Sequence, residues 1–231
     1  MAKDKTVQTE ISGYISTLLR THFGKGPTSV YVTITRSFIV IHLRGFMTPM
    51  EKLLLKQEES KRILETRDIL INSLKGDIIK GLKRMNDLEV KELYADWNLE
   101  KETGLILGVL EEEPDKDAFK GPNDVDEAAF RDKIQQASNN AEKVPGRTEI
   151  YWLSDRIILV RRSEILIRIE KALIRNGFTE ELKIAKRPVE HEVLKAVQLE
   201  DVLKRSISET FLDWNFDADL SYVVFLLDIR D

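Results

Sequence analysis

The feature that most constrains the fold of this chain is an internal repeat. Residues 90–100 (VKELYADWNLE) match residues 207–217 (ISETFLDWNFD), and the tripeptide Asp-Trp-Asn is identical in both. Two of the three tryptophans in the chain fall within this match. A second match, of residues 38–43 with residues 157–162, extends the repeat upstream. Because a repeat defines the structural unit, the chain is predicted to contain two tandem copies of one unit.

An acidic segment separates the two copies. Residues 111–127 carry eight acidic and two basic side chains, together with two prolines and a glycine. Segments of this composition stay solvated and do not pack into a core. We therefore predict a first unit at residues 1–113, an acidic linker at 114–125 and a second, diverged unit at 126–231.

The hydrophobic spacing predicts the same order of elements, α-β-β-α-α-β-β, in each copy. The predicted fold class is α+β, with antiparallel sheets and helices on one face of each sheet. In the first copy we expect a helix at 7–22, a hairpin with its turn at Arg36-Ser37, a helical region from Thr48-Pro49 to about residue 85, and a hairpin at 90–110. In the second copy we expect a helix at 126–141, strands at 148–153 and 157–162, helices within 164–205, and strands at 207–214 and 220–228.

The first hairpin also has a predicted register. A turn at Arg36-Ser37 places Ile34 opposite Ile39, Val32 opposite Ile41 and Val30 opposite Leu43, all on one apolar face. A slip of one residue would move every side chain to the other face of the sheet, so this register is strongly specified.

Composition excludes several kinds of chemistry. The chain has 231 residues and no cysteine, so it has no disulfide, thiolate metal site or cysteine nucleophile. Its three histidines lack metal-ligand spacing, and it has no phosphate-binding loop, dinucleotide fingerprint or Gly-x-Ser-x-Gly elbow. We therefore expect a protein without enzymatic activity, bound metal or cofactor.

Charge and hydropathy bear on location and partners. The net charge of −4 argues against nucleic-acid binding, which needs a basic surface. The longest apolar runs are far shorter than the roughly 20 residues of a membrane-spanning helix, which predicts no membrane insertion. The N-terminal segment lacks the apolar core of a signal peptide, so we expect a cytoplasmic protein.

One polar set in the first copy is a candidate anion site. Its members lie in the loop before the first strand, on the less apolar face of the hairpin and at the start of the next helix: Lys25, Thr28, Thr33, His42, Arg44 and Thr48. A helix N-terminus and an arginine fork both favour a small oxyanion such as bicarbonate. The alternative interpretation is an ordinary strand face and helix cap. The second copy has Arg161 and Ser163 in place of His42 and Arg44, so the site is expected in the first copy.

The repeated Asp-Trp-Asn tripeptides have a structural interpretation. Asp and Asn before a turn bond to nearby backbone groups, and Trp anchors a core. We expect Asp96-Trp97-Asn98 and Asp213-Trp214-Asn215 to serve the scaffold.

Residues 24–30 (GKGPTSV), the two following strands and residues 43–52 (LRGFMTPMEK) resemble the MpsC-like family, a bacterial family of unknown function with single or duplicated units. The resemblance is clearest over residues 10–70, and it adds Arg67 to the candidate anion-binding residues. The family is named after a sodium-dependent, membrane-potential-generating system whose membrane components are linked to bicarbonate uptake. The resemblance therefore implies a cytoplasmic accessory or sensor protein, and it supplies no catalytic residues.

Two functions follow as expectations. The first is a non-enzymatic protein that binds or senses a small oxyanion, bicarbonate in particular, and serves inorganic-carbon or sodium transport. The alternative is an interaction module that docks a membrane transporter or a second copy of itself without a small ligand. The expected partners are accordingly a small anion, transporter subunits and a homodimer partner, with no nucleic acid.

Overall fold

The structure, a computed structural model, describes residues 2–229 and, within them, all side chains except those of residues 2–5 and 116–117. The chain forms two compact units, Met1–Pro114 and Asp115–Asp231. Each unit contains a four-stranded antiparallel sheet with helices packed against it, which confirms the predicted α+β class.

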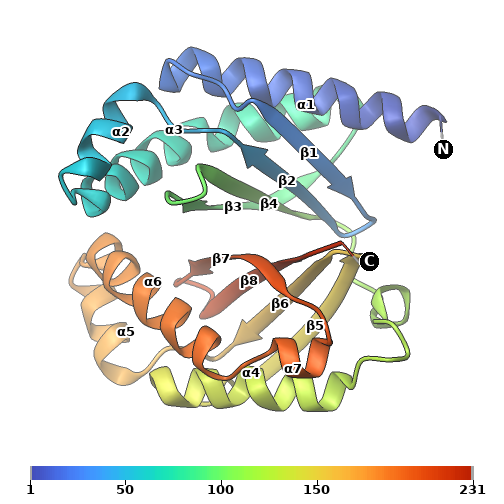
Figure 1. The fold of residues 1–231 in the computed structure, drawn as a ribbon, viewed down its shortest axis with the longest axis vertical. Coiled ribbons are helices and arrows are strands. Elements are labelled where there is room, and N and C mark those ends of the chain that lie inside the picture. Colours follow the sequence, from blue (N-terminus) through green and yellow to red (C-terminus); the bar gives the residue numbers. More distant parts are fainter. Residues whose placement is uncertain (1, 230–231) are drawn as a thin grey trace. The chain divides into compact units, whose positions relative to one another are not determined.

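The first unit follows the predicted order of elements. They are α1 (Ala2–Phe23), β1 (Ser29–Ile34), β2 (Phe38–Arg44), α2 (Pro49–Lys56), α3 (Ser60–Asn86), β3 (Val90–Asn98) and β4 (Thr103–Leu110) (Figure 1). The sheet order is β1-β2-β4-β3, so each hairpin contributes two neighbouring strands and the hairpins meet along β2 and β4.

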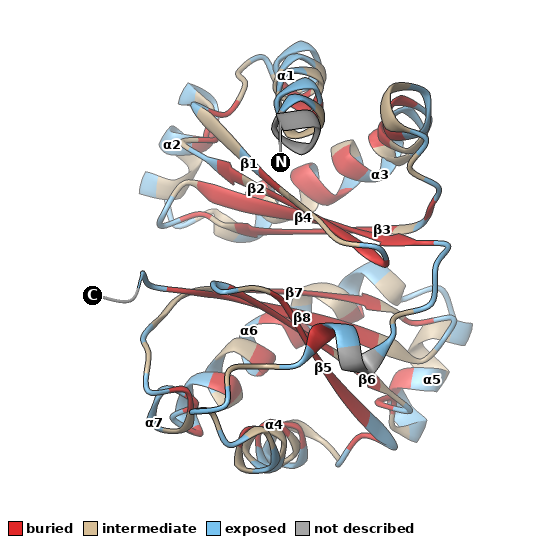
Figure 2. Cartoon of the chain, turned by 90° about the vertical axis from the view of Figure 1, so that its right-hand side faces the viewer, coloured by how far each residue is buried: buried red, intermediate tan, exposed pale blue. Residues whose placement is uncertain are grey.

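The core of this unit lies between the sheet and its helices. Helix α1 buries Ile11, Ile15 and Leu19 completely, and their spacing of four residues places them on one side of the helix. Helix α1 packs on β1, and α3 packs on both α1 and β3. Figure 2 shows α1, α2 and α3 on the same side of this sheet, as predicted.

The first hairpin has the predicted register: Ile34 pairs with Ile39, and Val30 with Leu43. The Thr35 side chain closes the turn, since its hydroxyl contacts both the nitrogen and the carbonyl oxygen of Phe38 at 3.0 Å. At the other end of the hairpin, Gly45 has a φ of +59°, and a Cβ there would lie 2.3 Å from the Thr28 hydroxyl oxygen. Glycine is therefore required where the chain leaves β2.

The second unit repeats this arrangement with two short additions, η1 (Lys116–Phe119) and α7 (Glu200–Leu203). Its other elements are α4 (Glu127–Ala141), β5 (Arg147–Ser154), β6 (Ile157–Ser163), α5 (Arg168–Arg175), α6 (Thr179–Ala196), β7 (Ile207–Asn215) and β8 (Leu220–Leu227). The sheet order β5-β6-β8-β7 matches that of the first unit. Helix α5 ends where expected, at Asn176-Gly177.

The predicted acidic linker packs more than its composition indicated. The one-turn helix η1 lies inside it, and Phe119 is buried with its ring edge-on to Tyr151 at a centroid distance of 5.7 Å. Gly121 approaches the indole of Trp152 so closely that a Cβ would lie 2.3 Å from its nitrogen. The expectation that this segment does not pack is therefore wrong at Phe119, because one aromatic ring offers enough apolar area to anchor a charged segment.

The Asp-Trp-Asn tripeptides serve the scaffold, as expected. Trp97 and Trp214 are buried in the cores of their units. The side-chain oxygen of Asn98 accepts a hydrogen bond from the Lys101 nitrogen at 3.1 Å, and Asn215 makes the corresponding bond to Ala218 at 3.0 Å. The repeat is therefore strongest where both units need the same turn.

Candidate functional site

Polar side chains of the first unit gather on the loop that joins β2 to α2. The Thr28 hydroxyl donates to the Arg44 carbonyl oxygen at 3.0 Å, and the Lys25 ammonium donates to the Met47 carbonyl oxygen at 3.0 Å. The Arg67 guanidinium donates to the Phe46 carbonyl oxygen at 2.7 Å. We call the five predicted residues that meet at this loop the loop cluster: Lys25, Thr28, Arg44, Thr48 and Arg67.

The start of α2 is capped by the chain itself. The Glu51 nitrogen donates to the Thr48 hydroxyl at 3.2 Å, and the Thr48 nitrogen donates to Glu51 Oε2 at 2.7 Å, which is a complete capping box. Arg67 donates two hydrogen bonds to the same carboxylate, from Nε to Oε1 at 2.7 Å and from Nη2 to Oε2 at 2.9 Å. The position where sequence reasoning placed an external oxyanion therefore holds the carboxylate of Glu51.

This buried pair is electrostatically balanced. Burial raises the pKa of Glu51, but the hydrogen bonds and charge of Arg67, together with the bonds to Thr48, outweigh it and leave that pKa below its usual value. The Arg67 guanidinium also lies 4.9 Å from the centre of the Phe46 ring and 4.8 Å from that of the Trp97 ring. Its Nη1 is buried without a hydrogen-bond partner, as is the indole nitrogen of Trp97.

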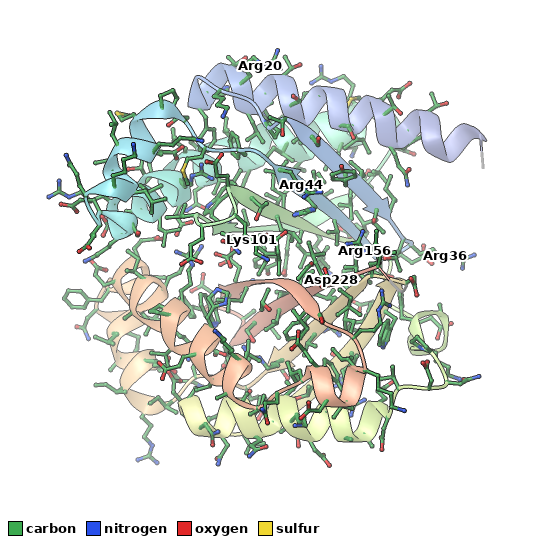
Figure 3. The ribbon with its side chains drawn as sticks, in the orientation of Figure 1. Arg20, Arg36, Arg44, Lys101, Arg156 and Asp228 are labelled. Carbon is green, nitrogen blue, oxygen red and sulfur yellow. The ribbon has the colours of Figure 1, made fainter. Side chains whose placement is uncertain are left out.

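Three of the predicted residues, Thr33, His42 and Arg44, belong to the strands of the hairpin. Arg44 is exposed at the end of β2, and Figure 3 labels it beside β1 and β2, with Arg36 at the turn of the same hairpin. The half-buried His42 ring stacks against Tyr31 at 6.2 Å. Thr33 pairs with Val40, nearer the turn and away from the loop. The structure thus brings five of the seven predicted residues to one loop and leaves Thr33 and His42 on the strands.

The second unit holds a cluster that sequence reasoning missed. Leu43 pairs with Gly104 in the first sheet, and Arg162 pairs with Ser221 at the same place in the second sheet. Arg162 is therefore the structural equivalent of Leu43, and the other equivalent positions follow from this alignment. At these positions the second unit replaces apolar core residues by polar ones. Leu19 becomes Ser138, Phe23 becomes Glu142, Leu43 becomes Arg162 and Ile71 becomes Glu190, while the pair Glu51–Arg67 becomes Glu170–Lys186.

These polar residues form one buried network, which we call the charge cluster: Ser138, Glu142, Arg162, Glu170, Lys186, Glu190 and Ser221. Arg162, only 1% exposed, donates to Ser221 at 2.8 Å, to Ser138 at 2.9 Å and to Glu190 at 3.0 Å. The Lys186 ammonium lies 2.7 Å from Glu142, 2.9 Å from Glu170 and 3.9 Å from Glu190. One ammonium thus faces three carboxylates.

A small cavity adjoins the charge cluster. It measures about 10 Å³ and is lined by Ser138, Glu142, Arg162, Lys186 and Glu190 together with Lys143 and two apolar residues. This is room for about one water molecule. Arg162 is one of the residues that line this cavity, and its Nη2 is buried without a hydrogen-bond partner.

The signal for this cluster was present in the repeat. The match of residues 38–43 with 157–162 already set Leu43 against Arg162, a change from an apolar to a charged residue at an inward-facing strand position. A charge at such a position is stable only with buried partners. Those partners lie on α4, α6 and β8, which are distant in sequence, so the network itself required the structure.

Among the side chains that the structure describes, no group of three or more His, Cys, Asp or Glu residues is placed to hold a metal ion. Within residues 2–229, no helix is both long enough and apolar enough to cross a membrane.

The fold and the two clusters define a duplicated α+β protein that carries buried, hydrogen-bonded charged side chains in both units. The chain belongs to the MpsC family: residues 3–112 match the family described as "Na+-translocating membrane potential-generating system (MpsC)". This match covers the first unit and confirms the resemblance. The family suggests a role linked to a Na+-translocating, membrane-potential-generating system.

A relative supports the same assignment. The uncharacterized protein YbcI of Bacillus subtilis (strain 168) is 32% identical over 102 residues, which cover 42% of this chain and 79% of the relative. No solved structure matches the chain.

Proposed function

We propose that this chain is a non-enzymatic cytoplasmic accessory protein of a Na+-translocating system, and that it binds or senses a small oxyanion, bicarbonate in particular, at the loop cluster. Membership of the family supports the link to that system. The observation that carries the ligand proposal is that the side chains of Lys25 and Thr28 bond to the backbone of residues 44–47, next to the exposed Arg44.

The internal carboxylate of Glu51 decides which groups are available to a ligand. It occupies the helix start and the fork of Arg67, so these groups hold the loop in shape. An external oxyanion uses the outer donors instead. The Lys25 ammonium has three N–H groups, one of which bonds the Met47 carbonyl, and the exposed Arg44 offers a planar fork.

Calorimetric titration of the full chain with bicarbonate tests this proposal. The wild type is expected to give a saturable heat that Arg44→Ala abolishes. Arg36→Ala is the matched control, because Arg36 is an exposed arginine at the turn of the same hairpin and is expected to leave the heat unchanged. No saturable heat in the wild type, or equal heat in Arg44→Ala, would remove this function.

A second function is favoured by the exposed face of α2. Met50 and Leu53 lie one helical turn apart and are 68% and 62% exposed, which is unusual for large apolar side chains. Such a face suits docking on a membrane subunit of the system or on a second copy of the chain. Capture of purified membrane subunits that is lost in Met50→Ser/Leu53→Ser and does not respond to bicarbonate favours this function over ligand sensing. Light scattering of the wild type and of Met50→Ser/Leu53→Ser measures the mass of each in solution, and it shows whether this face forms a homodimer.

A further inference from the structure

The charge cluster of the second unit contains one carboxylate more than its buried cations balance. Arg162 and Lys186 supply two positive charges, and Glu142, Glu170 and Glu190 supply three carboxyl groups. Four of these five side chains are at most 5% exposed, and that of Glu142 is 20% exposed. An unbalanced charge in such surroundings is costly, and a carboxyl group avoids the cost by keeping its proton.

Two further cations lie close to the cluster, in space or along the chain. Lys143 lines the cavity from the loop after α4, where it is half-buried and within reach of solvent. Arg187 follows Lys186 on α6 but is not among the residues that line the cavity. The hydroxyls of Ser138 and Ser221 bond Arg162 and carry no charge.

An independent observation points to a bound polar ligand at the same place. Arg162 is 1% exposed, its Nη2 has no hydrogen-bond partner, and the adjoining cavity has room for about one water molecule. A buried donor without a partner destabilises the folded state. A water molecule placed in this cavity would accept from Arg162 and could donate to Glu142 or Glu190, the two carboxyl groups in the lining.

We infer that the second unit carries a buried proton-binding site, in which Glu142 and Glu170 share one proton beside Lys186 and a water molecule bound to Arg162. The site is separate from the loop cluster and does not depend on the proposed function. It lies in the unit outside the family match, where Arg162 and Glu142 stand at the positions of the apolar Leu43 and Phe23 of the first unit.

The electrostatics of Glu142 agree with this inference. Burial and a hydrogen bond to Glu170 raise the pKa of Glu142 to about 7, against the opposing charge of Lys186. Glu142 is also the C-cap residue of α4, at the negative end of the helix dipole, where a carboxylate is disfavoured. Loss of the proton near neutral pH therefore places two facing carboxylates at the end of α4 and loosens the loop that leads to β5.

Carbon-detected NMR of the glutamate side-chain carboxyls, recorded on the full chain across pH 4 to 9, tests the site. We expect one glutamate to titrate near pH 7, far above the usual carboxyl range. Glu142→Gln removes this titration, because Glu170 then faces Lys186 without the carboxyl group with which it shares the proton. Glu113→Gln, at an exposed position, is the matched control and leaves it unchanged.

The wild-type titration decides the question even where a variant folds poorly. If no glutamate of the wild type titrates above about pH 5.5, a value between the usual carboxyl pKa and neutrality, the proton site is absent. If the neutral titration persists in both Glu142→Gln and Glu170→Gln, it belongs to another residue and the inference is overturned. A shift of the α4–β5 loop resonances with the same midpoint supports the predicted loosening of the loop.

Discussion

In the first unit, Leu43 on β2 and Ile71 on α3 close the core with apolar side chains, whereas the second unit places Arg162 and Glu190 at the same two positions. The backbone around them is the same, since both sheets have the same strand order and the same pairing at this point. The fold therefore does not need charges there. A buried ion pair is a weak source of stability compared with apolar residues of similar volume. The difference indicates that the second unit retains its charges for a reason other than stability.

Both units contain a buried ion pair at the same place, but the cation of the pair differs. Arg67 holds Glu51 with two bonds in the first unit, and Lys186 occupies its place beside Glu170 in the second. An arginine fork binds one carboxylate rigidly, while an ammonium distributes its bonds among several acceptors. The ammonium of Lys186 also contacts a second carboxylate, Glu142, which stands where the first unit has Phe23. The first unit thus has a closed pair, and the second has an open network that can gain or lose a proton.

The largest effect that tests this comparison is expected from Arg162→Leu. The change leaves Glu190 as a buried carboxylate without its guanidinium partner, and it removes the donor to Ser138 and Ser221. Breaking one side of a buried pair costs about 3–5 kcal/mol of unfolding free energy. Because the two units need not unfold together, hydrogen exchange in β6 and β8 is the appropriate measurement. Arg168→Leu, at an exposed position on α5, is the control and should change stability by less than about 0.5 kcal/mol.

A triple change should reverse that loss. Ser138→Leu, Arg162→Leu and Glu190→Ile together give the second unit the residues that the first unit has at these positions. The replacement of a buried ionic network by packed apolar residues is neutral or stabilises by about 1–4 kcal/mol. Hydrogen exchange of the triple variant should therefore equal or exceed wild-type protection. A triple variant as unstable as Arg162→Leu would show that the second unit depends on its charges for folding, and the comparison would fail.

The two units should respond to pH in opposite directions. The folded-state pKa of Glu142 lies near 7, above the ordinary value of 4.5, so its contribution to stability is fully present below pH 4.5 and is lost as pH rises through 7. The folded-state pKa of Glu51 is lowered, so its contribution is present above pH 4.5 and is lost as pH falls below that value. One proton changes stability by at most about 1.4 kcal/mol per pH unit.

Hydrogen exchange measured separately for each unit gives the change of stability with pH for both units in one sample. The intrinsic pH dependence of exchange is subtracted first. Between pH 4.5 and 7, amides of α4 and β6 should lose protection relative to those of α2 and α3. Glu142→Gln should remove the slope in the second unit and leave the first unit unchanged. Parallel slopes in the two units would contradict the assignment of Glu142 as the proton carrier.

The sequence predicted what depends on short-range pattern. The alternation of Val30, Val32 and Ile34 against Leu43, Ile41 and Ile39 defined the first register, and Thr48-Pro49 defined the start of α2. These features need only neighbouring residues. The sequence also showed that the loop cluster was polar, but it did not show that Glu51 fills the helix start, because that depends on Arg67 reaching back from α3.

The charge cluster lay beyond sequence reasoning for a similar reason. Its carboxylates come from α4, α5 and α6, and only the packing of these helices brings them to one ammonium. The buried Phe119 is a smaller case, because its anchoring ring belongs to Tyr151 on β5. Periodicity assigns residues to a face of their own element, and it does not give the distance between elements.

The smallest effect concerns the caps of the matched helices α2 and α5. The first has a complete capping box, whereas the second has only half of one, since the Ile167 nitrogen donates to Glu170 but the apolar Ile167 side chain returns no bond. Thr48→Ala should therefore cost about 1 kcal/mol, within the usual range for an N-cap. Ile167→Thr should restore the missing acceptor and stabilise α5 by a similar or smaller amount. Denaturant titration followed by hydrogen exchange in each helix measures both changes. If Ile167→Thr destabilises α5, then the half-buried Ile167 contributes more by packing than a cap would contribute by hydrogen bonding, and the two helix starts differ in more than one acceptor.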